Sequence, residues 1–173
     1  MRIDTTLVAF EVRRARAADA AAIARHRAEM FTDMGELPPA LYDPLLAAST
    51  RDLEAAIRAE DYVGWLAAPR GAPRQIVAGA GMQMRRMLPH PLRGPGGVLL
   101  AGGRQGLVLN VFTERAWRRK GLAGLLMRRV IDWAAGAGLD TLVLHASAEG
   151  RRLYERLGFA PTNEMRYQGD LHA

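Results

Sequence analysis

The sequence predicts an α/β fold of the α+β type, in which strands that follow one another pair as hairpins and helices flank the sheet. The first observation is a β-branched and aliphatic segment at residues 106–113, which is typical of a strand. The second is the helical spacing of the apolar residues that follow, namely Leu122, Leu125, Leu126, Val130 and Trp133. The third is the succession of strand-like segments at 62–67, 75–87 and 106–113 with no helical segment between them.

The first part of the chain predicts one strand and two helices. Residues 10–14 alternate in polarity as a strand does, and residues 18–31 have one apolar helical face. Residues 32–41 contain glycine and two prolines and predict a loop. The next helix is predicted to start with Asp43 as its N-cap and Pro44 at its first position, and to run to about residue 60.

The rest of the chain predicts five strands and two helices. Strands are predicted at 62–67, 75–87, 106–113 and 140–145, with a last strand at 165–168, and helices at 122–137 and 147–157. Residues 88–105 are rich in proline and glycine, which predicts a loop or an irregular hairpin. The predicted order is therefore β-α-α-β-β-β-α-β-α-β.

The composition is that of a soluble globular protein. The chain has 173 residues, 49% hydrophobic and 24% charged, and we expect one domain over residues 1–173. Neither a signal peptide nor a run of about 18 apolar residues is visible, so we expect a cytoplasmic protein with no membrane partner. The lack of cysteine excludes disulfides, thiolate zinc sites and a catalytic thiol, and the scattered histidines predict no metal site.

The net charge of +6 does not by itself indicate a nucleic-acid partner. Every basic residue except Lys120 is arginine, which suggests codon bias, and aromatic residues make up only 6% of the chain. We expect no nucleic-acid binding and rank it as a distant alternative. The densest basic cluster, Arg115 with residues 118–120, lies in the turn between the strand at 106–113 and the helix at 122–137.

This basic, glycine-bearing turn predicts a phosphate site. The N–H groups in the first turn of a helix have no intrahelical acceptor, and the helix dipole favours an anion there. Gly121 and Gly124 add no side-chain bulk, so a phosphate can approach the backbone closely.

Two motifs resemble those of the GNAT superfamily, the GCN5-related N-acetyltransferases that use acetyl-CoA. Residues 118–123, Arg-Arg-Lys-Gly-Leu-Ala, match the family's pyrophosphate motif Arg/Gln-x-x-Gly-x-Gly/Ala. Residues 153–159, Leu-Tyr-Glu-Arg-Leu-Gly-Phe, are similar to its Leu-Tyr-x-x-x-Gly-Phe signature. The resemblance implies a mixed, mostly antiparallel central sheet flanked by helices, with splayed central strands.

The resemblance also implies acetyl-CoA as co-substrate, with no metal. Its pantetheine arm would pair with the backbone around Val111 and Thr113, where the strand often bulges, and the amide of Val111 or Phe112 would hold the thioester oxygen. The implied cofactor-binding residues are Val111, Phe112, Thr113, Arg118, Arg119, Lys120, Gly121, Leu122, Ala123, Gly124 and Ser147. Ser147 stands where many relatives have asparagine, which reaches further.

Tyr154 is the predicted catalytic residue. A phenol with a pKa near 10 is protonated at neutral pH and can pass its proton to a departing thiolate. In the family the tyrosine of this motif commonly stands beside the coenzyme A sulfur. The alternative is a tyrosine that only packs on its helix, with its hydroxyl group at the surface.

The residues that receive the acceptor are less well defined. Glu29, Asp33, Glu114 or a water molecule could act as general base, although the more common role of such an acid is that of a solvated surface residue. Residues that could line the acceptor pocket are Met30, Phe31, Met34 and Tyr42.

The sequence therefore predicts an acetyl-CoA-dependent N-acetyltransferase that acts by direct attack of an amine. The acceptor is a small-molecule or peptide amine of unknown identity, and the family resemblance allows a homodimer. A non-catalytic acyl-CoA-binding regulatory module is the alternative, and it would need neither Tyr154 nor an acceptor pocket.

Overall fold

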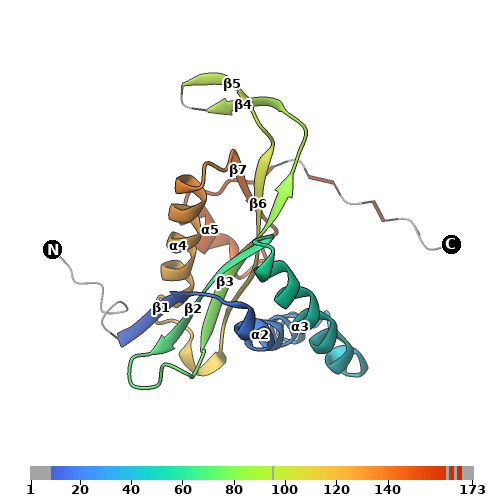
Figure 1. Cartoon of the computed structure of the whole chain (residues 1–173), viewed down its shortest axis with the longest axis vertical. Coiled ribbons are helices and arrows are strands. Elements are labelled where there is room, and N and C mark those ends of the chain that lie inside the picture. Colours follow the sequence, from blue (N-terminus) through green and yellow to red (C-terminus); the bar gives the residue numbers. More distant parts are fainter. Residues whose placement is uncertain (1–8, 95, 163, 166, 169–173) are drawn as a thin grey trace.

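A five-stranded sheet forms the centre of the molecule, with helices on both of its faces (Figure 1). The computed structural model describes residues 9–94, 96–162, 164–165 and 167–168. The strands are β1 (Phe10–Arg14), β2 (Tyr62–Pro69), β3 (Ala78–Arg86), β4 (His90–Gly94), β5 (Gly97–Ala101), β6 (Arg104–Thr113) and β7 (Thr141–Leu144). The helices are α2 (Ala20–Asp33), α3 (Tyr42–Arg58), α4 (Leu122–Gly136) and α5 (Arg151–Arg156), with 3₁₀ turns at Ala17–Asp19, Pro39–Leu41 and Arg115–Trp117.

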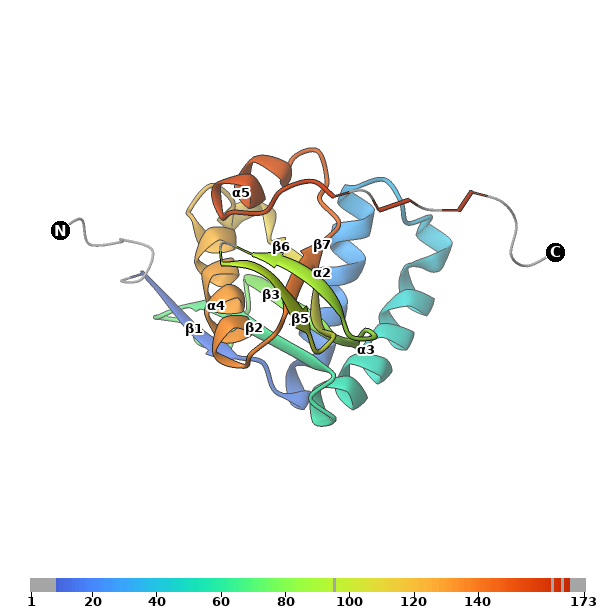
Figure 2. The same ribbon diagram turned by 90° about the horizontal axis from the view of Figure 1, so that it is seen from above.

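The strand order in the sheet is β1-β2-β3-β6-β7. Neighbouring strands from β1 to β6 run antiparallel, whereas β7 runs parallel to β6 because α4 carries the chain back between them. Figure 2 shows α2 and α3 on one face of the sheet and α4 on the other. The predicted mixed, mostly antiparallel sheet flanked by helices is confirmed.

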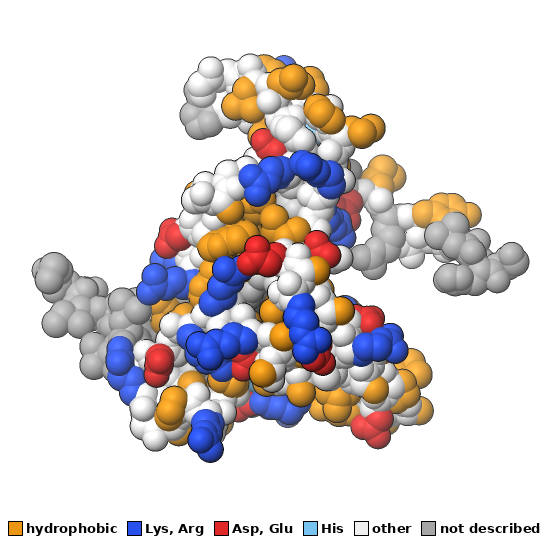
Figure 3. All heavy atoms as spheres, in the orientation of Figure 1, with side chains coloured by type: hydrophobic (Ala, Val, Ile, Leu, Met, Phe, Trp, Pro, Cys, Tyr) orange, Lys and Arg blue, Asp and Glu red, His pale blue; other side chains and the backbone are white. Residues whose placement is uncertain are grey.

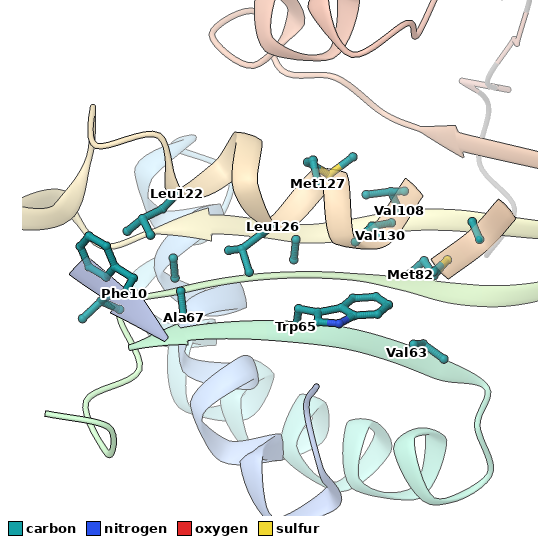
Figure 4. Close-up of a cluster of buried hydrophobic side chains, with 14 residues drawn as sticks. Phe10, Val63, Trp65, Ala67, Met82, Val108, Leu122, Leu126, Met127 and Val130 are labelled. Atoms are coloured by element: carbon teal, nitrogen blue, oxygen red, sulfur yellow. The ribbon is translucent and has the colours of Figure 1, made fainter. Parts of the chain in front are cut away.

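Two apolar clusters hold the layers together. In the first, α4 contributes Leu122, Leu126, Met127 and Val130, which cluster with side chains of the strands (Figure 4). In the second, α2 and α3 pack on the opposite face with Ala20, Ile23, Ala24 and Leu53. Apolar residues recur every three or four positions along α4, so they form one buried stripe along the length of the helix. Tyr154 and Phe159, on and after α5, pack against the edge of the first cluster.

A β-bulge interrupts the pairing of β3 with β6. Gly79 faces Phe112 and Gly81 faces Leu109, so one residue of β3 opposes two residues of β6, Asn110 and Val111. Asn110 has φ +57°, a left-handed conformation that asparagine tolerates better than most residues. The expected bulge in this strand is therefore present, and it breaks the alternation of side chains between the two faces.

Buried polar contacts support the bulge. The Asn110 amide donates to the Tyr62 hydroxyl oxygen over 3.3 Å and accepts from the Arg27 guanidinium over 2.8 Å. Burial raises the pKa of Tyr62 to about 12, so its hydroxyl group stays protonated. Gly81 makes room for this ring, because a Cβ atom at position 81 would lie 2.2 Å from the Tyr62 hydroxyl oxygen.

The segment predicted as a loop or an irregular hairpin is a regular antiparallel hairpin of β4 and β5. It projects from the end of the sheet (Figure 1). Hydrophobic side chains cover much of it in Figure 3, and among these Leu88 and Leu100 are 86% and 77% exposed.

The prediction of Asp43 as a helix N-cap is wrong. Helix α3 starts at Tyr42 and is capped by Leu41, because the 3₁₀ turn at Pro39–Leu41 runs directly into it. Asp43 and Pro44 lie inside the first turn, where a proline is tolerated because its missing N–H would have no intrahelical acceptor.

The end of the chain also differs from the prediction. Helix α5 is shorter than the predicted 147–157, because a turn precedes it. Met165, Tyr167 and Gln168 are not in a strand, and Arg166 lies outside the described residues. None of the helices in the described ranges combines the length and the apolar character that a membrane span needs.

Candidate functional site

The turn before α4 has the backbone geometry of an anion site. Gly121 caps the helix in a left-handed conformation with φ +82°, and Arg119 is also left-handed with φ +65°. The Leu125 amide donates to the Gly121 carbonyl over 3.0 Å, which is the first helical hydrogen bond. The amides of residues 122–124 therefore have no intrahelical acceptor, and no side chain caps the helix. Residues 118–121 are exposed, so a phosphate can reach the turn.

The side chain of Arg118 points away from that turn. Its Nε donates to the Thr113 carbonyl over 3.0 Å, its terminal nitrogen pairs with Asp33, and its guanidinium lies 5.6 Å from the centre of the Phe112 ring. Lys120 lies over the Trp117 ring at 4.5 Å. The groups that the turn offers to a phosphate are thus mainly backbone N–H groups.

One edge of β6 extends beyond its neighbour. Strand β7 pairs with β6 only over Gln105–Val108, so residues 109–113 continue past the end of β7. On the other edge, the Glu114 amide donates to the Val77 carbonyl of the β3 side over 2.9 Å. By the alternation of antiparallel pairing, Phe112 also faces β3, and Thr113 faces the open edge. Thr113 contributes only its N–H there, because its carbonyl is bound to Arg118.

Tyr154 is placed by α5 next to the start of α4. Its ring packs edge-on against Phe159, with 6.1 Å between ring centres, and a Cβ atom at Gly150 would lie only 2.9 Å from the ring. The neighbouring Leu153 would be 3.7 Å from a Cβ atom at Gly124 in the first turn of α4. Burial raises the pKa of Tyr154, which keeps the phenol protonated at neutral pH.

Ser147 shapes the turn that leads into α5. Its hydroxyl oxygen accepts from the Gly150 amide over 3.2 Å, and its carbonyl accepts from the Arg151 amide over 3.1 Å. Among the described residues the Ser147 hydroxyl proton has no acceptor, so Ser147 can donate it to a ligand.

A pocket of about 440 Å³ lies between α2, the start of α3 and the end of β6. Its lining residues are Arg25, Glu29, Thr32, Asp33, Tyr42, Phe112, Glu114, Arg115 and Ala116. All three acids considered as the general base are among them. Of the four residues expected to line the acceptor pocket, only Tyr42 does so. Phe31 instead stacks on the Arg27 guanidinium at 4.8 Å.

Each acid in this pocket is paired with arginine. Arg25 bridges two of them, donating to Glu29 over 2.8 Å and to Glu114 over 2.7 Å. Asp33 pairs with Arg115 and with Arg118. The hydrogen bond from Arg115, helped by Arg118, lowers the pKa of Asp33, which makes this carboxylate a weak base.

The sequence reasoning missed His26, which lies under the pocket. Its side chain is almost fully buried, its ring packs on Phe112 with 5.2 Å between centres, and its Nε2 lies 3.4 Å from Glu114 and 3.2 Å from Arg25. Burial, and then the charge of Arg25, lower the pKa of His26. The only available signal was its helical spacing from Ile23 on the buried face of α2.

The chain is similar to known acetyltransferases in sequence and in fold. The model of the acetyltransferase (GNAT) family matches residues 23–159. A GCN5-related N-acetyltransferase from Ralstonia eutropha JMP134 superposes with a TM-score of 0.77 and 28% identity, over 91% of this chain and 97% of that one. The comparison with curated proteins gave no match.

Two further solved structures share the fold. A predicted acetyltransferase with acetyl-CoA from Clostridium acetobutylicum has a TM-score of 0.74 and 24% identity, over 92% of this chain and 96% of that one. An aminoglycoside N-acetyltransferase in complex with CoA has a TM-score of 0.64 and 16% identity, over 94% and 95% of the two chains.

The family match covers most of the chain and includes the turn at 118–124, the pocket and Tyr154. Enzymes of this family transfer an acetyl group from acetyl-CoA to an amine. The chain therefore belongs to the GNAT family of N-acetyltransferases.

Proposed function

We propose that this enzyme, acting as a single domain over residues 1–173, transfers the acetyl group directly from acetyl-CoA to an amine held in the pocket. The observation that carries the proposal is that the turn at residues 118–124, which we call the phosphate turn, and the pocket meet at the end of β6. Phe112 and Glu114 line the pocket, while Arg118 of the turn binds the Thr113 carbonyl between them. A thioester lying along the open edge of β6 would thus reach the pocket with its acetyl end.

The cofactor residues divide into backbone and side-chain roles. The amides of residues 119–124 would bind the pyrophosphate, with Arg119 and Lys120 adding screened attraction. The backbone of Val111 and Thr113 would pair with the pantetheine arm, and Ser147 would donate its hydroxyl proton to it. The Phe112 amide faces β3, so we assign the thioester oxygen to the Val111 amide, whose hydrogen bond strengthens as an oxyanion forms.

Two side chains would move protons. Tyr154 would protonate the departing thiolate, because burial keeps its phenol protonated until that thiolate forms. Glu114, directly or through a water molecule, would accept the proton of the attacking amine. It lines the pocket at the end of β6, whereas the lowered pKa of Asp33 makes that acid a poor base.

The test is release of free coenzyme A thiol from acetyl-CoA with a panel of amines. Tyr154→Phe and Glu114→Gln should each lower kcat by about 100-fold, the lower range for general acid–base catalysis, and leave the Kd of acetyl-CoA nearly unchanged. Tyr167→Phe is the matched control, since Tyr167 is 70% exposed, and should behave as the wild type. Wild-type turnover by Tyr154→Phe across the pH range would refute its role. Tight acetyl-CoA binding without turnover of any amine would favour the regulatory module.

A further inference from the structure

The charges around the pocket are separated into two ends. At one end, Glu29 and Glu114 share the single guanidinium of Arg25, so two carboxylates face one cation. At the other end, Asp33 lies between the guanidinium groups of Arg115 and Arg118, so one carboxylate faces two cations. His26 beneath the first end is buried, and burial keeps its ring neutral. The first end therefore has one excess negative charge and the second one excess positive charge.

The negative end has unused acceptor atoms. Arg25 and His26 both approach Oε1 of Glu114, and Arg25 approaches Oε1 of Glu29. Within the described part of the chain, the Oε2 atoms of these two carboxylates have no hydrogen-bond partner. An ammonium group has three donors and no acceptor, so it complements two such oxygens.

The positive end has unused donors. Arg115 contacts Asp33 through Nε and one terminal nitrogen, and within the described residues its other terminal nitrogen makes no hydrogen bond. The Arg115 side chain is 76% exposed at the rim of the pocket. A guanidinium is suited to planar anionic oxygens, which it binds with parallel hydrogen bonds.

We propose that the acceptor is an amine that also carries an anionic group, as an amino acid does. Its ammonium group would lie against Glu29 and Glu114, and its carboxylate or phosphate oxygens against Arg115. Tyr42 and Phe112 supply aromatic surface to the lining of the pocket, which suits an apolar or aromatic body. This inference rests on the proposed function, because it takes the pocket as the acceptor site.

A pocket of this polarity disfavours two other kinds of amine. An analogue in which an uncharged group replaces the anionic one (a neutral analogue), such as an amino acid amide, would leave the unused donor of Arg115 without an acceptor. A diamine would place its second positive charge near Arg115 and Arg118, where like charges repel.

The experiment compares L-phenylalanine with two analogues of similar size, L-phenylalaninamide and phenethylamine, in the thiol-release assay. O-Phosphoethanolamine against ethanolamine tests a phosphate in place of the carboxylate, and putrescine serves as the diamine. We expect kcat/KM for at least one anion-bearing amine to exceed that of its neutral analogue by at least 10-fold, about the worth of one charge-assisted hydrogen bond.

Arg115→Ala should remove most of that preference and leave the neutral analogues nearly unaffected, while Arg115→Lys should restore part of it. Arg51→Ala is the matched control, because Arg51 is exposed on α3 and, among the residues that the structure describes, pairs only with its neighbour Asp52. The inference is overturned if neutral amines or putrescine are preferred, or if Arg115→Ala lowers all rates equally.

A binding measurement separates this inference from the proposed function. If no amine is acetylated, the proposed function fails, but calorimetric titration of the CoA-loaded protein still compares L-phenylalanine with its amide. Tighter binding of L-phenylalanine, lost in Arg115→Ala, would support the dipolar pocket even then. Equal binding of the two would refute it.

Discussion

The turn at residues 118–124 and the pocket that we propose for the acceptor lie at the same end of β6 but are built in different ways. The turn uses the backbone of seven consecutive residues, 118–124, and its shape depends on left-handed Arg119 and Gly121. The pocket uses side chains from distant segments, since Arg25 on α2 pairs with Glu114 at the end of β6. A backbone site tolerates many side chains, whereas a side-chain site changes with each substitution.

Under the proposed function, this difference would allow the acceptor to change while the cofactor stays the same. The anion site needs only glycine at the correct positions and a helix behind it. The pocket can be rebuilt through a few lining residues on α2 and the 3₁₀ turn at Arg115–Trp117 without disturbing the cofactor. Separate perturbation of the two regions should therefore produce separable defects.

The largest expected effect is loss of cofactor binding when Gly121 is replaced with valine. A β-branched residue is strained at φ +82°, and its side chain would crowd the amides that we propose bind the pyrophosphate. Loss of two charge-assisted hydrogen bonds, about 1.5–3 kcal/mol each, should weaken acetyl-CoA binding by at least about 100-fold in a calorimetric titration. Gly136→Ala is the control, because a Cβ atom there meets open space at the other end of α4. An unchanged Kd in Gly121→Val would show that the turn does not hold the cofactor.

A smaller effect is expected from a substitution of Asn110, which lies in the bulge of β6 and bonds to Tyr62 and Arg27. Asn110→Ala removes two hydrogen bonds in a buried site. The Tyr62 hydroxyl group and the Arg27 guanidinium each lose a partner there. With the added cost of a left-handed alanine, the free energy of unfolding should fall by about 2–4 kcal/mol in chemical denaturation.

Asn110→Gly separates the two causes. Glycine adopts the left-handed conformation without cost but makes no side-chain hydrogen bond, so this variant should be less destabilised than Asn110→Ala. Equal stability of the two variants would mean that the left-handed backbone contributes little at this position.

The smallest effect is a pH dependence of stability through His26. Its pKa is lowered by folding, so below about pH 6.5 the unfolded chain binds a proton that the folded chain does not. The contribution of His26 to the free energy of unfolding is complete above that pH and is lost as the pH falls toward the pKa of His26 in the folded state. The free energy of unfolding then changes by at most about 1.4 kcal/mol per pH unit.

The groups that face His26 are Arg25, Glu29 and Glu114. His26→Asn should flatten the dependence of the unfolding free energy on pH between 7 and 5. A steeper slope in His26→Asn would contradict the neutral, buried state of this ring.

The same contrast, between a site of consecutive residues and a site of distant ones, explains which parts of the site could be predicted from the sequence. Residues 118–124 and 153–159 are contiguous, so their chemistry can be recognised before any fold is known, and the structure places them on adjacent helices. Apart from the β4–β5 hairpin and the end of the chain, the order of the elements along the chain followed from hydrophobic periodicity, which depends only on near neighbours.

What the sequence could not reveal depends on contacts between distant residues. Glu29, Asp33 and Glu114 were each a candidate base, but their common pocket and their arginine partners became visible only in the structure. His26 showed only a buried helical position, and its place beside Glu114 depends on how α2 packs against β6. The cap predicted at Asp43 failed because the preceding 3₁₀ turn shifts the start of α3.

The tight fit of Tyr62 against Gly81 restricts which sequence changes the fold can accept. A side chain at position 81 would displace the hydroxyl group that holds Asn110, so it would disturb a bulge two strands away from Tyr62. Removing the Tyr62 ring first would make room for that side chain, and the second change would then cost less than it does alone. Positions 62 and 81 are therefore epistatic, and among homologous sequences they should vary together or not at all.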